Sequence, residues 1–253
     1  MHYNDYYDVI KQNLHPVTNA NRFVSITDRA DTSDLPKNAW GPLLANPYVQ
    51  SWGEILLNKG PLEIALYPML LHELRPKTII ELGAFNGGSA VWLADHLDIF
   101  RIECAIYSLD IDISLVHDKA KADKRIHFIQ GDCNDLSPTL SHELLATLPH
   151  PWLVIEDAHV NLTGVLEYFH NNGLQSEDYL IVEDTNQFMW DYWRDHWDDK
   201  EEIEEGYQKM IDLRNWLMSH SNEYLIDTHY QDMYGKNGSK CWNSILKKVE
   251  SEM

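Results

Sequence analysis

The 253-residue sequence has few cysteines and lacks a long apolar run. Cys104, Cys133 and Cys241 are widely separated and form no C-x-x-C pair, which excludes a disulfide framework and a zinc ribbon. No window reaches the roughly 18 uncharged apolar residues that a membrane span needs, and the N-terminus has no signal-peptide pattern. We therefore expect a soluble protein of the reducing cytoplasm.

Basic residues are also scarce, since 20 Lys and Arg stand against 40 Asp and Glu, giving a formal net charge of -20. Such a charge repels nucleic acid and anionic membrane surfaces. The sequence thus disfavours nucleic-acid and membrane partners, and it favours a small-molecule ligand or a protein partner.

From about residue 60 to 185 the sequence alternates helical and strand patterns, which is typical of βαβ units and a parallel α/β sheet. The later part predicts a helix, a strand, a turn and a final strand that can lie antiparallel. The first 60 residues read as an irregular extension with short helices, before a domain of residues 61–253. The predicted strands span residues 78–82, 103–109, 125–130, 152–155, 179–182, 223–228 and 239–249.

A glycine-bearing loop follows the first of these strands, in the stretch ELGAFNGGS. A dinucleotide fingerprint would need glycine at position 85, which is Phe85, so the loop predicts a cofactor without a pyrophosphate. The second strand ends at Asp110, where a carboxylate can hold a ribose diol, and the third ends near Asp132, in a polar tip able to contact a base. Each feature alone is equally compatible with an ordinary turn.

Paired carboxylates follow two further strands: Asp157 comes after one, and Glu183 and Asp184 come directly after the next. Adjacent parallel strands would bring all three to one edge of the sheet. They would repel one another unless a cation neutralised them, and oxygen ligands favour Mg²⁺, Ca²⁺ or Mn²⁺ over zinc. In the alternative interpretation, Glu183 and Asp184 only cap the next helix and face water.

The motifs ELGAFNGGSAVWLAD, SLDID, VIEDAH and YLIVEDT, in this order, resemble the cephalosporin hydroxylase-type branch of S-adenosylmethionine-dependent class I methyltransferases, which includes rhamnosyl O-methyltransferases. The resemblance covers roughly residues 60 to 250. It implies a Rossmann-like α/β fold with a seven-stranded, mostly parallel sheet, a last antiparallel strand and helices on both faces.

The resemblance also implies a site for S-adenosylmethionine and magnesium. Asp157, Glu183 and Asp184 match the family's magnesium ligands, and His159 is placed to take a proton, although it can equally hydrogen-bond its own loop. Asp110 would hold the ribose hydroxyls. The residues expected around the cofactor are Glu81, Gly83, Ala84, Ser89, Asp110, Asp132, Cys133 and, shared with the metal, Asp157.

Residues 186–206 depart from the family pattern in a tryptophan-rich, acidic insert that we expect to be exposed and partly helical. Trp190, Trp193 and Trp197 either stack on a substrate or pack a lid or subunit interface. Aromatic residues of the first 60 residues predict a subunit contact, in a homo-oligomer, or a cover over the pocket; they are Tyr3, Tyr6, Tyr7, Trp40, Tyr48 and Trp52.

Three functions are therefore open. The first is a magnesium-dependent O-methyltransferase acting on a small hydroxylated molecule such as a sugar or a secondary-metabolite scaffold. The second is a non-haem iron oxygenase, suggested by the H-x-D of His196 and Asp198. The third is a non-catalytic partner subunit that keeps the fold, which the three acids argue against.

Overall fold

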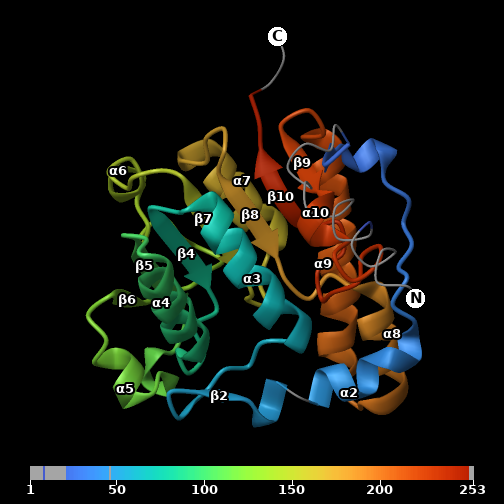
Figure 1. The fold of residues 1–253 in the computed structure, drawn as a ribbon, viewed down its shortest axis with the longest axis horizontal. Helices are drawn as coiled ribbons and strands as arrows, with labels where there is room; N and C mark the ends of the chain where they lie inside the picture. Colours follow the sequence, from blue (N-terminus) through green and yellow to red (C-terminus); the bar gives the residue numbers. More distant parts are fainter. Residues whose placement is uncertain (1–7, 9–20, 46, 251–253) are drawn as a thin grey trace.

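An eight-stranded sheet crosses the molecule in the order β1-β9-β10-β8-β7-β4-β5-β6 (Figure 1). The computed structural model describes Asp8, residues 21–45 and residues 47–250; the expectations for Tyr3, Tyr6 and Tyr7 lie outside these residues. The strands are β1 (Phe23–Val24), β4 (Thr78–Leu82), β5 (Ala105–Asp110), β6 (Ile126–Gln130), β7 (Trp152–Glu156), β8 (Tyr179–Val182), β9 (Tyr224–Asp227) and β10 (Ile245–Lys248).

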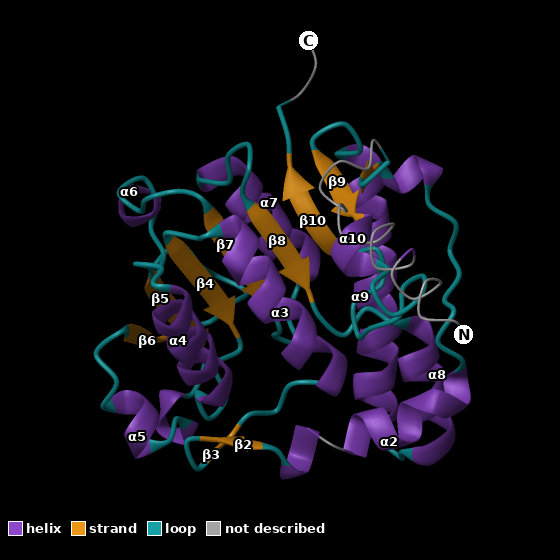
Figure 2. Ribbon diagram, viewed as in Figure 1, coloured by secondary structure: helices purple, strands orange, loops and turns teal. Residues whose placement is uncertain are grey.

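Strands β4 to β8 pair in parallel, and β10 lies antiparallel between β8 and β9. The expected mostly parallel sheet with a last antiparallel strand is thus confirmed. An eighth strand was not expected: Phe23 and Val24, from the N-terminal extension, add an antiparallel edge to β9. A separate hairpin of β2 (Ser51–Trp52) and β3 (Ile55–Leu56) lies apart from this sheet (Figure 2).

Helices cover both faces of the sheet because successive strand residues point to opposite sides. Ile80, Val154 and Leu180 pack with α7 (Leu162–Asn172) and α9 (Lys200–Ser219). The strand residues next to these three point to the opposite face of the sheet. There they pack with α3 (Pro61–Leu74) and α4 (Gly88–Phe100), which cross in front of the sheet in Figure 1. The shorter helices are α5 (Asp118–Lys121), α6 (His142–Leu145) and α10 (Thr228–Gln231).

The insert is more ordered and more buried than expected. It forms α8 (Gln187–His196) and the start of α9, and α8 packs on α2 (Trp40–Ala45) of the N-terminal extension. Met189 and Trp190 are buried in this contact, which corrects the expectation of an exposed segment. Most acidic residues of the insert are exposed to solvent, whereas Asp191 accepts a hydrogen bond from Tyr207 and Glu202 is half-buried.

Arg22 fastens the N-terminal extension to the sheet. Its guanidinium donates to both carboxylate oxygens of Asp227 at 2.7 Å, and to Glu73 at 2.7 Å. Tyr179 donates a further hydrogen bond to Asp227, so this fully buried acid is well satisfied. The pairing fixes β1 beside β9.

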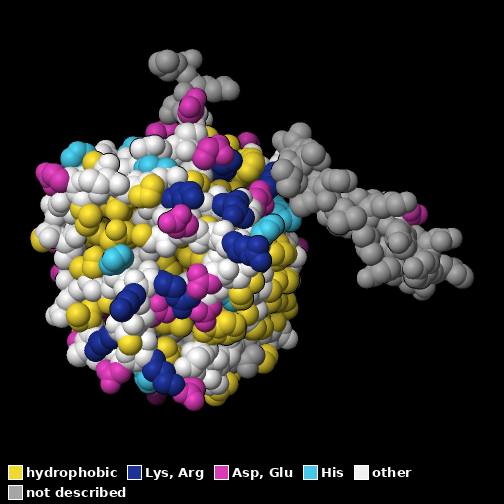
Figure 3. All heavy atoms as spheres, turned by 60° about the vertical axis from the view of Figure 1, so that its left-hand side comes forward, with side chains coloured by type: hydrophobic (Ala, Val, Ile, Leu, Met, Phe, Trp, Pro, Cys, Tyr) yellow, Lys and Arg dark blue, Asp and Glu magenta, His cyan; other side chains and the backbone are white. Residues whose placement is uncertain are grey.

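Surface charge is mixed on the face shown in Figure 3, where basic and acidic side chains are interspersed. The acidic excess is therefore not gathered into one patch on this face. Within the described residues, no helix combines the length and apolar character needed to cross a bilayer.

Candidate active site

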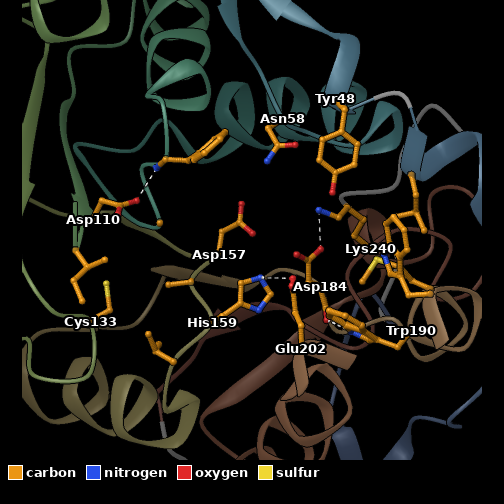
Figure 4. A pocket seen from close by; sticks show the side chains of 18 of the residues that line it. Tyr48, Asn58, Asp110, Cys133, Asp157, His159, Asp184, Trp190, Glu202 and Lys240 are labelled. Carbon is orange, nitrogen blue, oxygen red and sulfur yellow. Dashed lines mark hydrogen bonds and ion pairs between the residues drawn. The ribbon is translucent and has the colours of Figure 1, made fainter. Parts of the chain in front are cut away.

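A cavity of about 470 Å³ opens at the carboxyl ends of β4, β5, β7 and β8 (Figure 4). Loops after these strands form one side, and the insert with the N-terminal extension forms the other. Asp157 points into the space between the two sides. The lining residues used below are Leu44, Tyr48, Asn58, Gly83, Phe85, Asp110, Asp132, Cys133, Asn134, Asp157, His159, Asp184, Met189, Trp190, Trp193, Trp197, Glu202 and Lys240.

Gly83 gives the first loop its shape. Its φ of +96° favours glycine, and a Cβ there would lie 2.3 Å from the carbonyl oxygen of Asp157. The backbones after β4 and β7 therefore approach each other closely, which only glycine allows. Gly83, Asp110, Asp132 and Cys133, which the sequence led us to expect around a cofactor, all line the cavity.

The carboxylate of Asp110 accepts hydrogen bonds from the backbone N–H groups of Phe85, at 2.7 Å, and of Asp112, at 3.0 Å. It thus fixes the loop and still faces the cavity. Burial raises the pKa of the Cys133 thiol to about 12, so this side chain is a neutral, apolar part of the wall.

Glu81, Ala84 and Ser89, also expected around the cofactor, do not line the cavity. Glu81 stands within β4, where both faces of the sheet are covered, and its fully buried carboxylate accepts from Ser89 at 2.5 Å and from Ser108 at 2.6 Å. Ala84 is buried as well. These buried residues stabilise the glycine-bearing loop after β4 without facing the cavity.

The three predicted metal ligands come to neighbouring positions of the sheet edge because Glu156 of β7 pairs with Val182 of β8. Two lysines pair with them and offset two of the three negative charges. Lys59 Nζ lies 2.7 Å from Asp157 Oδ2 and 2.7 Å from Glu183 Oε1, and Lys240 Nζ lies 2.7 Å from Asp184 Oδ1. A metal ion was the only neutralising cation expected from the sequence, and neither lysine was predicted.

The carboxylates differ in accessibility and in proton affinity. Glu183 is fully buried behind Lys59 and Tyr67, whose hydroxyl donates to Glu183 Oε1, and it does not line the cavity. Burial, together with the charge of Asp157, raises the pKa of Glu183 to about 7. Burial also opposes the charge of Asp157, but Lys59 and Lys240 outweigh it and lower the pKa of Asp157 to about 2.

Asp184 adopts a left-handed backbone conformation, with φ of +58°. Such a conformation in a non-glycine residue is held by its surroundings and is enriched at functional sites. Here the indole N–H of Trp190 donates to the carbonyl oxygen of Asp184 at 2.7 Å. Trp190 is 2% exposed, so it supports Asp184 from the insert instead of presenting a ring face.

Replacing Trp190 with phenylalanine is expected to lower the free energy of unfolding by about 1–2 kcal/mol, because the carbonyl of Asp184 loses its donor. Urea unfolding measures the change. Trp193→Phe is the matched control, since the Trp193 indole N–H donates to no described residue. If both variants lose the same free energy of unfolding, the loss comes from the smaller ring and the hydrogen bond contributes nothing measurable.

Trp193 and Trp197 form an aromatic pair at the mouth of the cavity, with ring centroids 5.1 Å apart, and Trp197 is 37% exposed. Leu44, Tyr48 and Asn58 complete this wall from the N-terminal extension. The aromatic content of the extension had left open whether it covers the pocket. No spacing rule could have identified Asn58.

His159 lies beside Glu202 in the cavity wall, with Nε2 3.8 Å from Glu202 Oε1 (Figure 4). Glu202 was not predicted. Its position follows from the start of α9, where the side chain of Asp199 accepts from the Glu202 N–H. The pattern D-x-x-E could have placed this helix start, but not its approach to the loop after β7.

The H-x-D of the oxygenase hypothesis lies outside the cavity. His196 ends α8, stacks on Tyr192 and contacts its carbonyl oxygen through Nδ1 at 2.8 Å. No third ligand joins His196 and Asp198 in the described part of the chain. Elsewhere in the described residues, His170, His220 and Glu223 have ligand atoms within 4.8 Å of one another. These three side chains do not line this cavity.

Asp157 and Asp184 nevertheless fit a hard divalent cation. Both line the cavity, and each uses one oxygen for a lysine while the other accepts no hydrogen bond from a described residue. Buried Glu183 Oε2 likewise accepts none within the described residues. An all-oxygen donor set of this kind suits Mg²⁺. Glu183, in contrast, is committed to Lys59 and Tyr67.

The sheet order, the antiparallel last strand and the cavity at the strand ends define an α/β protein of the class I methyltransferase fold. The Rhamnosyl O-methyltransferase/CmcI family matches residues 46–243, and the chain belongs to this family.

A rhamnosyl O-methyltransferase of Mycobacterium tuberculosis is 26% identical over 125 residues, which are 47% of this chain and 50% of that protein. The chain therefore matches about half the length of this curated relative. A solved structure of CmcI described as Mg-SAM is 28% identical, with a TM-score of 0.64, and covers 98% of this chain and 100% of its own. An apo-structure of CmcI is 30% identical, with a TM-score of 0.62, over 80% of this chain and 77% of its own.

Proposed function

We propose that this protein is an S-adenosylmethionine- and magnesium-dependent O-methyltransferase of a small hydroxylated molecule. The observation that carries the proposal is the position of Asp157 between a glycine-loop half and an aromatic half of one cavity. One half suits a nucleoside, and the other suits an acceptor. The family membership and the CmcI structure described as Mg-SAM support this choice.

The glycine-loop half would take S-adenosylmethionine. Asp110 would accept hydrogen bonds from the ribose hydroxyls, and Asp132 and Asn134 would contact the base. Gly83 lets the backbone approach the cofactor. Glu81, Ala84 and Ser89 would act indirectly, by holding the loop.

Asp157 and Asp184 would hold the divalent cation, with Glu202 as a further carboxylate across the cavity. When bound, the cation supplies Lewis acidity that makes an alcohol easier to deprotonate. Asp184 is held rigid by its own backbone conformation and by Trp190, which is the preorganisation that such a ligand needs.

His159 would accept the proton of the acceptor hydroxyl. It lies two residues beyond Asp157, and Glu202 is placed to orient the imidazole and to stabilise its protonated form. Methyl transfer then needs the acceptor oxygen in line with the sulfonium methyl group, a matter of positioning.

Trp193, Trp197 and Tyr48 would contact the acceptor, for which a sugar or a secondary-metabolite scaffold fits the aromatic wall. The N-terminal extension would act as a cover of the pocket, since Leu44 and Tyr48 line it. A homo-oligomer and a cytoplasmic location complete the proposal.

Calorimetric titration of S-adenosylmethionine tests the cofactor directly. We expect saturable binding, weakened about ten- to a hundredfold in Asp110→Asn because charge-assisted hydrogen bonds are lost. Asparagine is chosen because Asp110 also accepts two backbone hydrogen bonds in its loop. Asp118→Asn, a helix residue outside the cavity, is the control. Absence of binding in folded, cofactor-free protein would refute the proposed function.

A further inference from the structure

Lys59 is built into the interior of the site. Its side chain is 2% exposed, and its ammonium group bridges Asp157 and Glu183 at 2.7 Å each. Lys59 is followed by Gly60, where a Cβ would lie 2.0 Å from Glu63 Oε2, and by α3, which begins at Pro61. The chain around Lys59 is therefore closely packed, and the lysine is not a surface side chain that folds over an open site.

The ammonium group of Lys59 is held in its charged form. Burial opposes the charge, but Asp157 and Glu183 outweigh it and raise the pKa of Lys59. A buried ammonium group is tolerated only when it is paired in this way. Lys59 and its two carboxylates therefore form one unit, in which loss of the lysine leaves Asp157 and Glu183 without the ammonium group that they share.

This unit decides which carboxylates are free for a divalent cation. Glu183 gives Oε1 to Lys59 and Tyr67 and stays out of the cavity. Asp157 gives only Oδ2 to Lys59 and turns toward the cavity, where Asp184 also lies. Three carboxylates against Lys59 and Lys240 leave a single negative charge at this edge, so the site is nearly balanced without a metal.

On the basis of the proposed function, we propose that Lys59 is a resident cation of the metal site. It ties Glu183 to Asp157, so that Asp157 and Asp184 hold the divalent cation while Glu183 holds the lysine. The positive charge beside Asp157 weakens metal binding, and it makes folding independent of the metal. Sequence matching alone would instead count Glu183 as a metal ligand.

Lys59→Met tests this inference because methionine fills similar space without the charge. We expect its affinity for Mg²⁺, measured by calorimetry, to rise at least tenfold above that of the unchanged protein. Its thermal midpoint should fall in EDTA and recover in Mg²⁺, because the cation then balances Asp157 and Glu183. The midpoint of the unchanged protein should respond little to either addition.

Lys209→Met is the matched control. Lys209 is buried and lies 2.7 Å from Glu156, but neither residue lines the cavity. Its loss should lower the thermal midpoint equally in EDTA and in Mg²⁺ and should raise the Mg²⁺ affinity by much less than tenfold, because Lys209 pairs with Glu156 and not directly with Asp157 or Asp184. Lys59→Arg keeps the positive charge, so its Mg²⁺ affinity should not rise tenfold.

If Lys59→Met does not fold, the double variant Lys59→Met/Glu183→Gln removes both charges and is compared with Glu183→Gln. The double variant should bind Mg²⁺ at least tenfold more tightly. Equal or weaker Mg²⁺ binding without the lysine, or unfolding of the unchanged protein by EDTA, would overturn the inference. Titration of S-adenosylhomocysteine into the unchanged protein judges the proposed function separately, since it does not involve Lys59.

Discussion

Asp184→Asn is expected to lower kcat for methyl transfer by about a hundredfold or more, while S-adenosylmethionine binding is retained. A residue that stabilises developing charge typically contributes about 10²–10³ in kcat. Asparagine tolerates the left-handed backbone of Asp184, whose φ is +58°, so the substitution removes the charge without straining the loop. Radiolabelled methyl transfer to a panel of sugars and hydroxylated scaffolds, with Mg²⁺ present, measures the loss.

Asp198→Asn is the control for this experiment, because Asp198 is an exposed acid of the insert that does not line the cavity. The thermal midpoint of Asp184→Asn is measured alongside, since Lys240 loses its partner. Full turnover in Asp184→Asn would show that the Asp184 carboxylate is not needed for methyl transfer. Full turnover of the unchanged protein in EDTA would show that the reaction does not depend on a metal ion.

The parallel part of the sheet could be predicted because its strands are short apolar runs buried on both faces. The bounds of β4 and β8 agree with those predicted from the sequence. The last strand was predicted too long, at residues 239–249, whereas β10 begins at Ile245. The backbone N–H groups of Trp242, Ser244 and Asn243 donate to the side chains of Thr185, Gln231 and Asn237, respectively. These N–H groups therefore bond to side chains instead of to a neighbouring strand.

The cavity residues in the loops after the strands could be predicted, because the end of a strand can be recognised in a single sequence. Lys59 and Glu202 could not be found in this way, because they reach the site from an extension and an insert whose packing depends on tertiary contacts. Three crowded carboxylates require a cation, and this much could be predicted from the strand ends. A buried lysine satisfies the requirement as well as a metal ion does, so the kind of cation could not be predicted.

Arg22→Met is expected to destabilise the protein by about 3–5 kcal/mol, the usual effect of breaking a buried ion pair by removing one partner. Arg22 is 3% exposed and Asp227 is fully buried, so the substitution leaves an uncompensated carboxylate inside the protein. Tyr179 still donates to Asp227, but a neutral donor does not balance the charge. Urea unfolding, with a check that the m-value is unchanged, gives the free energy.

Lys37→Met is the matched control, because Lys37 also joins the N-terminal extension to the rest of the chain, through Asp195. Lys37 and Asp195 are 35% and 48% exposed, so water screens this pair and its loss should cost under about 1 kcal/mol. Similar losses in both variants would mean that Asp227 is stabilised mainly by Tyr179. A much larger loss for Arg22→Met would establish that the buried ion pair with Asp227 contributes strongly to holding β1 beside β9.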